Sequence, residues 1–434
     1  MYNSIYTTCC RDIQRRPSVS FQYAAIPACI SELTTYAGVR TSEINIALTQ
    51  LKDGVIQRGI QYASNTVPSR GGFMAENFVA ESYNLDAVLK NIDASPAIVP
   101  GETGRASADV RYDGGEASLK FYKDAKSSGK SQLNPEYGEQ DRIVPADQLD
   151  DAKAVINKIA DQNKLKGRMD VTEEQRAIAD RLTDHISNDD GIKSTPLTKQ
   201  QDMDMAKAIR KDADGNIIVD ETKIDQVIKD TGISERVRIT KLHNELAGLG
   251  LAAAIGLGMG VTMSLVSGLA RAGLDSEKIG DVVFDSLGAG MESGTIAAVT
   301  YTAGRGATYL METMGSNLMS VSGYIANFAA IGLLSTSIIC ICQFTKSKLN
   351  GVSTNEALES TGKTALSSMT MFAVSLAAQG IWGGPAGIIV STGAGLIILA
   401  VDTGKTVHTR RLEKRIREYS IEEYKNVIDS KKII

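Results

Sequence analysis

The sequence predicts a chain in two parts, a soluble α+β N-terminal half and an all-α, glycine-rich membrane half. The first observation is that three windows of the 434 residues carry no charged side chain: Leu246–Ala270, Thr313–Thr345 and Thr364–Val401. About 20 apolar residues in a helix cross the hydrocarbon core of a bilayer, so each window is long enough to span it. The second observation is that the residues before about position 245 are dense in charge and contain no comparable window.

These patterns divide the chain into five segments. They are a helical N-terminal segment (1–70), an α/β core (71–150), a charged helical connector (151–245), a membrane-spanning helical domain (246–404) and a basic C-terminal helix (405–434). The shift in charge near residue 245 gives one of these boundaries.

Composition excludes several classes of function. The net charge of −4 provides no global basic field for nucleic acid, and 5% aromatic residues argue against a base-stacking platform. Five cysteines, with Cys9 adjacent to Cys10, do not form a disulfide pattern, and three scattered histidines make a zinc site improbable. No apolar run precedes the charged residues Arg11 and Asp12, so no secretory signal is expected and the N-terminal half is predicted to be cytosolic.

The windows also predict how the membrane helices are arranged. Gly256 and Gly260 have the GxxxG spacing, which lets two helices approach closely in lipid. The segment Trp382–Gly387 (WGGPAG) breaks the last window into two short helices, about 366–381 and 388–401. A re-entrant pair and two complete crossings both fit this pattern.

Basic residues flank the windows and predict that both termini lie in the cytoplasm. They include Lys346, Lys348 and Lys363, and the run from Lys405 to Arg417 follows the last window. That final run would contact anionic lipid or form a solvated cytoplasmic helix. Between the first two windows, Asp281–Glu312 fits either a pore-lining or interfacial helix that carries Glu292, or an amphipathic connector.

In the polar half, Asp151–Asp190 is helical by the spacing of its apolar residues, with Ala152 and Ile156 on one face and Ile178 and Leu182 on another. Asp212–Asn216 has alternating acids like a calcium loop. Its glycine stands at the fourth place rather than the sixth, so we expect a β-turn before a strand at Ile217.

Residues 72–123 contain the candidate chemistry. A helix beginning at Gly72 carries Glu76 and Glu81, and two strands, Ala108–Tyr112 and Ala117–Tyr122, follow around an Asp-Gly-Gly turn. The hairpin places Asp109 and Lys120 on neighbouring strands. Carboxylates of this kind hold Mg²⁺, and a lysine beside them assists the nucleophile or offsets the charge that develops on a phosphate.

These residues resemble the restriction-endonuclease-like superfamily, written PD-(D/E)XK, and its Mrr-like branch in particular, over 60 to 80 residues. The resemblance implies that Glu76 or Glu81 is the helix acid, Asp109 the strand acid and Lys120 the lysine. It implies Mg²⁺ as cofactor, held by Asp109 and Glu81. Ser118 stands where the family has an acid or glutamine, and because serine is a weaker metal ligand, this departure leaves turnover open. A structural α/β element with a surface Asp and Lys is the alternative.

The whole chain also resembles bacterial membrane proteins of mobile elements and phage defence that end in a WGGPAG-containing tail. We therefore expect it in the bacterial inner membrane, as a membrane-anchored nuclease or DNA sensor whose Lys123, Lys126 and Lys130 touch phosphates. A membrane effector that forms a pore or depolarises the membrane, with a non-catalytic soluble half, is the alternative. A non-enzymatic scaffold or a phage-derived injection component is the third class of function. In each case we expect contact with lipid and homo-oligomers through the Gly/Ala-rich helices.

Overall fold

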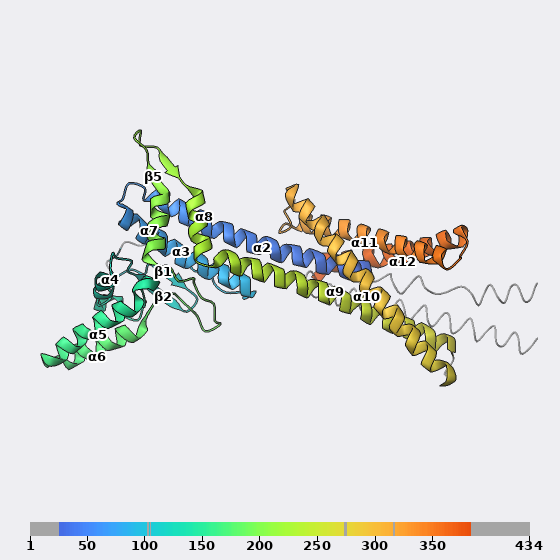
Figure 1. The fold of residues 1–434 in the computed structure, drawn as a ribbon, viewed down its shortest axis with the longest axis horizontal. Coiled ribbons are helices and arrows are strands. Elements are labelled where there is room, and N and C mark those ends of the chain that lie inside the picture. The colour runs from blue at the N-terminus through green and yellow to red at the C-terminus, as the bar shows by residue number, and fades with distance from the viewer. Residues whose placement is uncertain (1–25, 102–103, 105, 273–275, 316, 383–434) are drawn as a thin grey trace, which may run out of the picture. The chain divides into compact units, whose positions relative to one another are not determined.

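The computed structural model describes residues 26–101, 104, 106–272, 276–315 and 317–382 and is mostly helical (Figure 1). Two compact units divide the chain: Thr41–His243, and Met1–Arg40 together with Asn244–Ile434. The predicted boundary near residue 245 coincides with this division. The helices are α2 (Ile26–Gln61), α3 (Val67–Lys90), α4 (Ala125–Ser131), α5 (Leu149–Leu165), α6 (Met169–Arg181), α7 (Lys199–Ala208), α8 (Glu221–Asp230), α9 (Ile233–Ala272), α10 (Ser276–Thr313), α11 (Val321–Leu349) and α12 (Thr354–Trp382).

A small mixed sheet lies at the centre of the unit Thr41–His243. Its strands follow the order β1 (Val110–Tyr112), β2 (Gly115–Leu119), β3 (Asp141–Ile143) and β4 (Leu182–Thr183). The pair β1–β2 is antiparallel and β3 runs parallel to β2, while Ile98 forms an antiparallel bridge to Arg111 at the outer edge. The predicted hairpin is confirmed, although β2 begins and ends earlier than the sequence suggested.

Helix α3 packs against this sheet and contains the predicted helix. Proline in its first turn favours its start, and Asn91, in the left-handed conformation, ends it. The Tyr83 hydroxyl donates to the carbonyl of Asp113 in the hairpin turn, at 3.1 Å. Asn84 exchanges two hydrogen bonds with the backbone of Ala97. These contacts fix the helix to the first strands, and an apolar core that includes Phe78 fills the space between them.

The segment 151–245 is part of the same unit as the sheet rather than a separate connector. Helices α5 and α6 form an antiparallel hairpin between β3 and β4, and α7 packs on α3. Asp212–Asn216 forms the turn of a second hairpin, β5 (Ile209–Lys211) and β6 (Ile217–Val219), as expected. The sequence could not assign the connector to the core because β4, which joins it to the sheet, is only two residues long.

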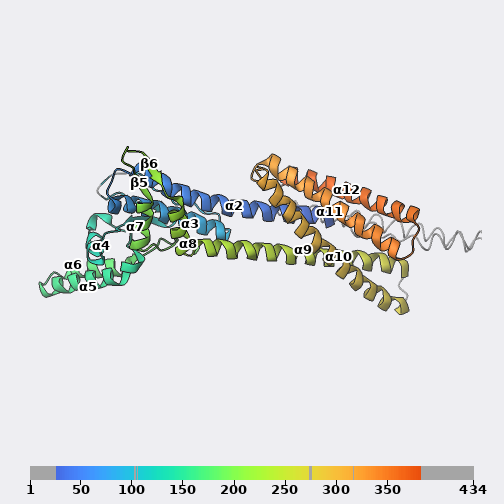
Figure 2. The ribbon, with the colours of Figure 1, turned by 45° about the horizontal axis from the view of Figure 1, so that its top comes forward.

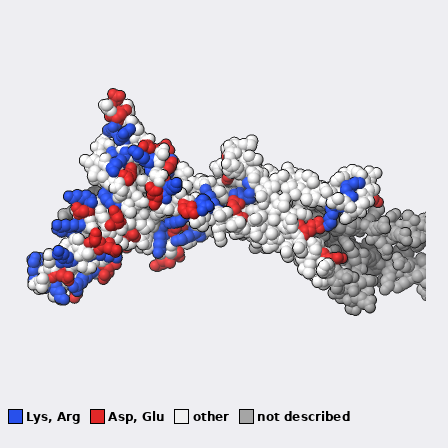
Figure 3. All heavy atoms as spheres, in the orientation of Figure 1, with Lys and Arg blue, Asp and Glu red and all other residues white. Residues whose placement is uncertain are grey.

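The second unit is built from α9 after His243, from α10–α12 and from the first part of α2, up to Arg40. Figure 3 shows few charged side chains over these helices, whereas Lys, Arg, Asp and Glu crowd the other unit. Helices α11 and α12 run alongside each other (Figure 2). The second window is shorter than predicted, because α10 ends at Thr313 and α11 begins at Val321. The WGGPAG break after Trp382 and the basic C-terminal run lie outside the described residues.

Among the described residues, one helical segment, Ser322–Leu349, is long and apolar enough to cross a membrane, and its 18-residue apolar window has a mean hydropathy of 2.1. The other predicted crossings stay predictions. Helix α9 is apolar only in its second part, since it begins at Ile233 in the charged region. The Asp281–Glu312 segment forms most of α10, where Glu292 makes an ion pair with Lys346 of α11.

Polar contacts also lie inside this second unit. Glu32 of α2 is 1% exposed and accepts a hydrogen bond from the Tyr324 hydroxyl at 3.1 Å. Arg305 of α10 pairs with Glu245 of α9, with Nε lying 3.0 Å from each carboxylate oxygen. The sequence did not indicate that the first part of α2 contributes an acid to this helical unit.

The GxxxG spacing in α9 allows a close approach to another helix of the same chain, α10. A Cβ atom on Gly256 would lie 2.5 Å from the carbonyl oxygen of Ser293, and one on Gly260 would lie 2.6 Å from that of Ala289. These distances are far below van der Waals contact, so α9 and α10 approach closely because both glycines lack a side chain. Association of separate copies through such faces stays a prediction.

Substituting Gly256→Ala should therefore destabilise the helical unit. The added methyl group collides with backbone on α10, which cannot move as freely as a side chain, and we expect a loss of about 1–3 kcal/mol. Thermal unfolding of the full chain in detergent measures it. Gly258→Ala is the matched control, because a Cβ atom there meets nothing within 4 Å. Equal melting temperatures for the two variants would contradict the close packing.

Candidate functional site

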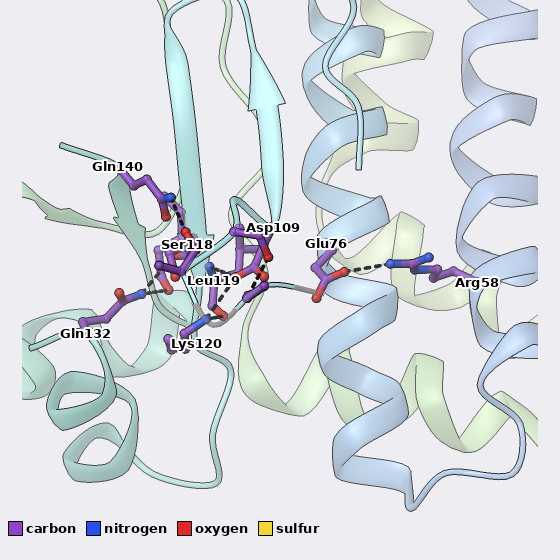
Figure 4. Close-up of polar contacts among 12 residues, drawn as sticks. Arg58, Glu76, Asp109, Ser118, Leu119, Lys120, Gln132 and Gln140 are labelled. Atoms are coloured by element: carbon purple, nitrogen blue, oxygen red, sulfur yellow. Dashed lines mark hydrogen bonds and ion pairs between the residues drawn. The ribbon is translucent and has the colours of Figure 1, made fainter. Parts of the chain in front are cut away.

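The candidate site lies at one edge of the sheet, where β1 begins and β2 ends (Figure 4). Asp109 directly precedes β1, and its N–H donates to the carbonyl of Ala117 on β2 at 2.9 Å. Lys120 directly follows β2, and its N–H donates to the carbonyl of Ile143 on β3 at 2.9 Å. Both residues are thus fixed by ladder hydrogen bonds, so the backbone under their side chains is well defined.

The side chains of Asp109 and Lys120 meet. Asp109 Oδ2 accepts hydrogen bonds from the Leu119 N–H at 2.7 Å and from Lys120 Nζ at 3.0 Å. The same ammonium group donates to the Leu119 carbonyl at 3.1 Å. The two side chains are 22% and 16% exposed, so water screens the pair only partly. A carboxylate oxygen and a carbonyl oxygen therefore converge on one positive charge.

Tyr137 lies beside this pair on a short 3₁₀ helix (Pro135–Tyr137). Lys120 Nζ is 5.0 Å from the centre of its ring. Burial lowers the pKa of Lys120, but Asp109 and Tyr137 outweigh that effect and raise it above its ordinary value. Lys120 therefore remains an ammonium ion at neutral pH. The sequence pattern did not indicate Tyr137, because helix α4 separates it from β2.

Glu76 approaches from α3 on the other side of Asp109 (Figure 4). Its side chain is 14% exposed and accepts a hydrogen bond from Arg58 Nη2 of α2 at 3.1 Å. Burial raises the pKa of Glu76 to about 7, and the charge of Asp109 adds to this, whereas Arg58 and Lys120 oppose it. Near neutral pH the carboxyl group is thus divided between its charged and neutral forms, even with Arg58 beside it.

Arg58 is itself held in place. Its guanidinium lies 5.0 Å from the ring centre of Tyr62 and 5.6 Å from that of Phe73, and the two rings stack at 3.8 Å. This cation–π contact orients the group that holds Glu76. No signal in the sequence pointed to Arg58, because it is more than a dozen residues from every predicted site residue.

Ser118 is completely buried, and its Oγ has no hydrogen-bond partner among the described residues. Since Val110 pairs with Ala117, continuing the register by one residue places Ser118 opposite Asp109. Gln132, also buried, donates to the carbonyls of Ser118 and Ile143 at 2.9 Å. Its Oε1 likewise has no partner in the described part of the chain. Buried oxygens of this kind are acceptors for a water molecule or a bound group.

Glu81 lies apart from Glu76, Asp109 and Lys120. It lies five residues after Glu76 on α3, which turns it to a different face of the helix. There it accepts a hydrogen bond from Asn84 at 3.3 Å and packs close to Gly54 of α2. The structure brings together Glu76, Asp109 and Lys120, with Ser118 beside them, and leaves Glu81, one of the two expected metal ligands, outside this group.

The oxygen atoms at the candidate site match the ligands of a divalent cation in part. Among the described residues no group of three or more His, Cys, Asp and Glu side chains could hold a metal ion. Mg²⁺ is often held by only one or two carboxylates, with water and substrate phosphate completing its ligands. Asp109 and Glu76 supply two carboxyl groups, and the Lys120 ammonium stands where Asp109 Oδ2 and the Leu119 carbonyl converge on a cation. The unpartnered Ser118 Oγ is a third, weaker oxygen.

No protein-family model, curated protein or solved structure matches the chain. The geometry of the site therefore carries the functional argument.

Glu76→Gln should change how stability depends on pH. Because the folded-state pKa of about 7 is raised above the ordinary 4.5, the protonated group stabilises the fold fully below pH 4.5, and this contribution is lost as pH rises through 7. We expect the wild type to lose about 2–3 kcal/mol relative to Glu76→Gln over this range. Urea unfolding at both ends of the range measures the difference. Glu81→Gln is the matched control, and parallel curves for Glu76→Gln and wild type would contradict the raised pKa.

Proposed function

We propose that the unit Thr41–His243 is a restriction-endonuclease-like nuclease domain that acts on DNA with Mg²⁺ at the cytoplasmic face of a membrane. The observation that carries the proposal is the convergence of Glu76, Asp109 and Lys120 from one helix and two strands. The order of these elements is the one that the resemblance to the PD-(D/E)XK superfamily implies. Such a convergence from separate elements is unusual for surface charges that only keep a protein soluble.

Each residue has a chemical role in this proposal. Asp109 and Glu76 would hold the metal, which polarises a phosphodiester and lowers the pKa of bound water. Lys120, charged at neutral pH, is placed to offset the negative charge that develops on the phosphate. Glu76 would bind the metal as a carboxylate, so metal binding would displace the proton that its pKa of about 7 leaves on part of the molecules at neutral pH. Tyr137 covers the ammonium of Lys120 and limits where it can turn.

The membrane half supplies the location in this proposal. Ser322–Leu349 would cross the bilayer, and the basic residues in its last turn, Lys346 and Lys348, would lie on the cytoplasmic side. Phage defence is the biological role we infer for a nuclease held there, since incoming DNA passes that face.

The second candidate is a membrane effector that depolarises the cell. It is favoured by the buried Glu32 and by the Arg305–Glu245 pair, because ionisable groups among apolar helices often mark a path for ions. Under this alternative the soluble half detects a trigger and has no catalysis of its own.

Expression in bacterial cells separates the two. A nuclease should cause plasmid loss that disappears in Asp109→Ala while the membrane potential of the cells stays normal. An effector should collapse the membrane potential in a way that survives Asp109→Ala but is lost in Arg305→Met. Plasmid loss that persists in Asp109→Ala would exclude the proposed site.

A further inference from the structure

The hairpin of α5 and α6 ends in a tip, residues 164–171, in which every residue is exposed. The hairpin is inserted between β3 and β4 of the sheet that carries the candidate site. Because β3 runs parallel to β2, the chain leaves the sheet toward α5 from the same edge at which Lys120 lies. The base of the hairpin is fixed by an apolar cluster that includes Ile156, Ile178 and Leu182.

The tip has a defined shape. Gly167 has a φ of +73° and ends α5 in a Schellman motif. Its N–H donates to the Lys164 carbonyl and the Arg168 N–H to the Asn163 carbonyl, each at 3.0 Å. Next to the turn, Asn163 donates to Gln175 on α6 at 3.0 Å. The side chains at the tip are therefore presented on a stiff support.

An apolar side chain projects from this support. Leu165, in the last turn of α5, is 89% exposed, the most exposed large hydrophobic residue in the described part of the chain. The residue after the glycine is Arg168 and its partner across the turn is Asn163, so the turn lacks the apolar contact that often accompanies a Schellman motif. Met169, at 49% exposure, lies beyond it.

Positive charge surrounds Leu165. Lys164, Lys166 and Arg168 form no ion pair within the described residues, whereas the nearest acid of α5, Asp161, is paired with Arg176 at 2.9 Å. Asp170 is the one carboxylate within residues 164–171, so three positive charges face one negative charge. An apolar wedge between unpaired cations is the combination with which proteins enter the minor groove of a duplex.

We propose that this tip is a DNA-binding element that grips duplex phosphates with Lys164, Lys166 and Arg168 and places Leu165 in the groove. The inference rests on the proposed function for its choice of ligand and extends it, because it assigns duplex binding to a part of the chain away from the catalytic residues. An anionic bilayer is the less suitable partner, since anchoring there needs a broad apolar face. Of the three exposed apolar side chains at the tip only Leu165 projects almost fully, whereas Met169 and Val171 are 49% and 38% exposed.

Binding of the full chain in detergent to a fluorescein-labelled duplex, without divalent metal, tests the inference. The triple variant Lys164→Gln, Lys166→Gln, Arg168→Gln should weaken binding by about tenfold or more and reduce the slope of log K against log salt by about 2–3. Leu165→Ser should weaken binding about tenfold but leave the slope unchanged, because it removes no charge. Lys158→Gln, an exposed lysine midway along α5, is the control and should match wild type.

Wild-type affinity and slope in the triple variant would overturn the inference, as would an equal loss in Lys158→Gln. So would a loss of binding to phosphatidylglycerol vesicles in the tip variants with DNA binding intact, because the tip would then contact lipid. The failure of the proposed function is a separate result. A chain that binds DNA through the tip yet does not cut it with Mg²⁺ removes the nuclease and leaves the tip inference standing.

Discussion

Lys120→Met should reduce Mg²⁺-dependent DNA cleavage by about 10²–10³-fold or more, because it removes a fixed positive charge from the place where negative charge develops on the phosphate. Methionine keeps the length of the side chain, so the fold should survive. The Asp109 carboxylate keeps its hydrogen bond from the Leu119 N–H at 2.7 Å. Single-turnover cleavage of a labelled duplex at saturating protein measures the chemical step apart from binding.

The matched control is Arg111→Met, which removes a cation from the same hairpin. Arg111 pairs with Glu116 at 2.8 Å, and both side chains are more than 40% exposed. An exposed pair of this kind contributes little, so the variant should cut at the wild-type rate. Equal losses in Lys120→Met and Arg111→Met would show that the hairpin needs positive charge in general, and would contradict a specific role for Lys120.

Lys199→Met should produce the largest loss of stability. Lys199 Nζ of α7 lies 2.5 Å from Asp202 Oδ2 and donates to the carbonyl of Phe121, just after β2, at 2.7 Å. Asp202 is completely buried beneath Gly71 of α3, where a Cβ atom would lie 2.6 Å from its Oδ1. Removing the lysine leaves a buried carboxylate without its partner, and we expect the free energy of unfolding to fall by about 3–5 kcal/mol.

The loss should depend on pH. Burial raises the pKa of Asp202 to about 6, and Lys199 opposes this, so without the lysine the pKa rises further. A raised folded-state pKa gives stability that is present at low pH and lost as pH rises through the folded value. Urea unfolding should therefore show a greater cost of Lys199→Met above the pKa than below it. Adding Asp202→Asn to the Lys199→Met variant should restore much of the lost free energy of unfolding. A cost that is the same at both pH values would contradict the buried pair.

Local patterns predicted much of the fold. The Asp-Gly-Gly turn predicted the β1–β2 hairpin, and the charge shift predicted the boundary between the units. The parallel pairing of β3 with β2 and with β4 was not predictable, because β3 and β4 are only three and two residues long and leave no periodic signal. For the same reason the sequence did not show that the helices of 151–245 belong to the same unit as the sheet.

The proximity of Asp109 and Lys120 was predictable, because both residues belong to one hairpin. Choosing between Glu76 and Glu81 required the packing of α3, since both are acids on one predicted helix. Arg58 and Tyr137 act through tertiary contacts with Glu76 and Lys120, and nothing in their local sequence distinguishes them from other surface residues.

The measurement that tests the central claim most directly is cleavage of supercoiled plasmid by the purified full chain, with and without Mg²⁺, beside Asp109→Asn. Asparagine keeps the shape of the side chain but removes the negative charge that would hold the metal and pairs with Lys120. The account predicts nicking that requires Mg²⁺ and is lost in Asp109→Asn. Absence of Mg²⁺-dependent cleavage by the wild type, or equal cleavage by Asp109→Asn, would contradict it.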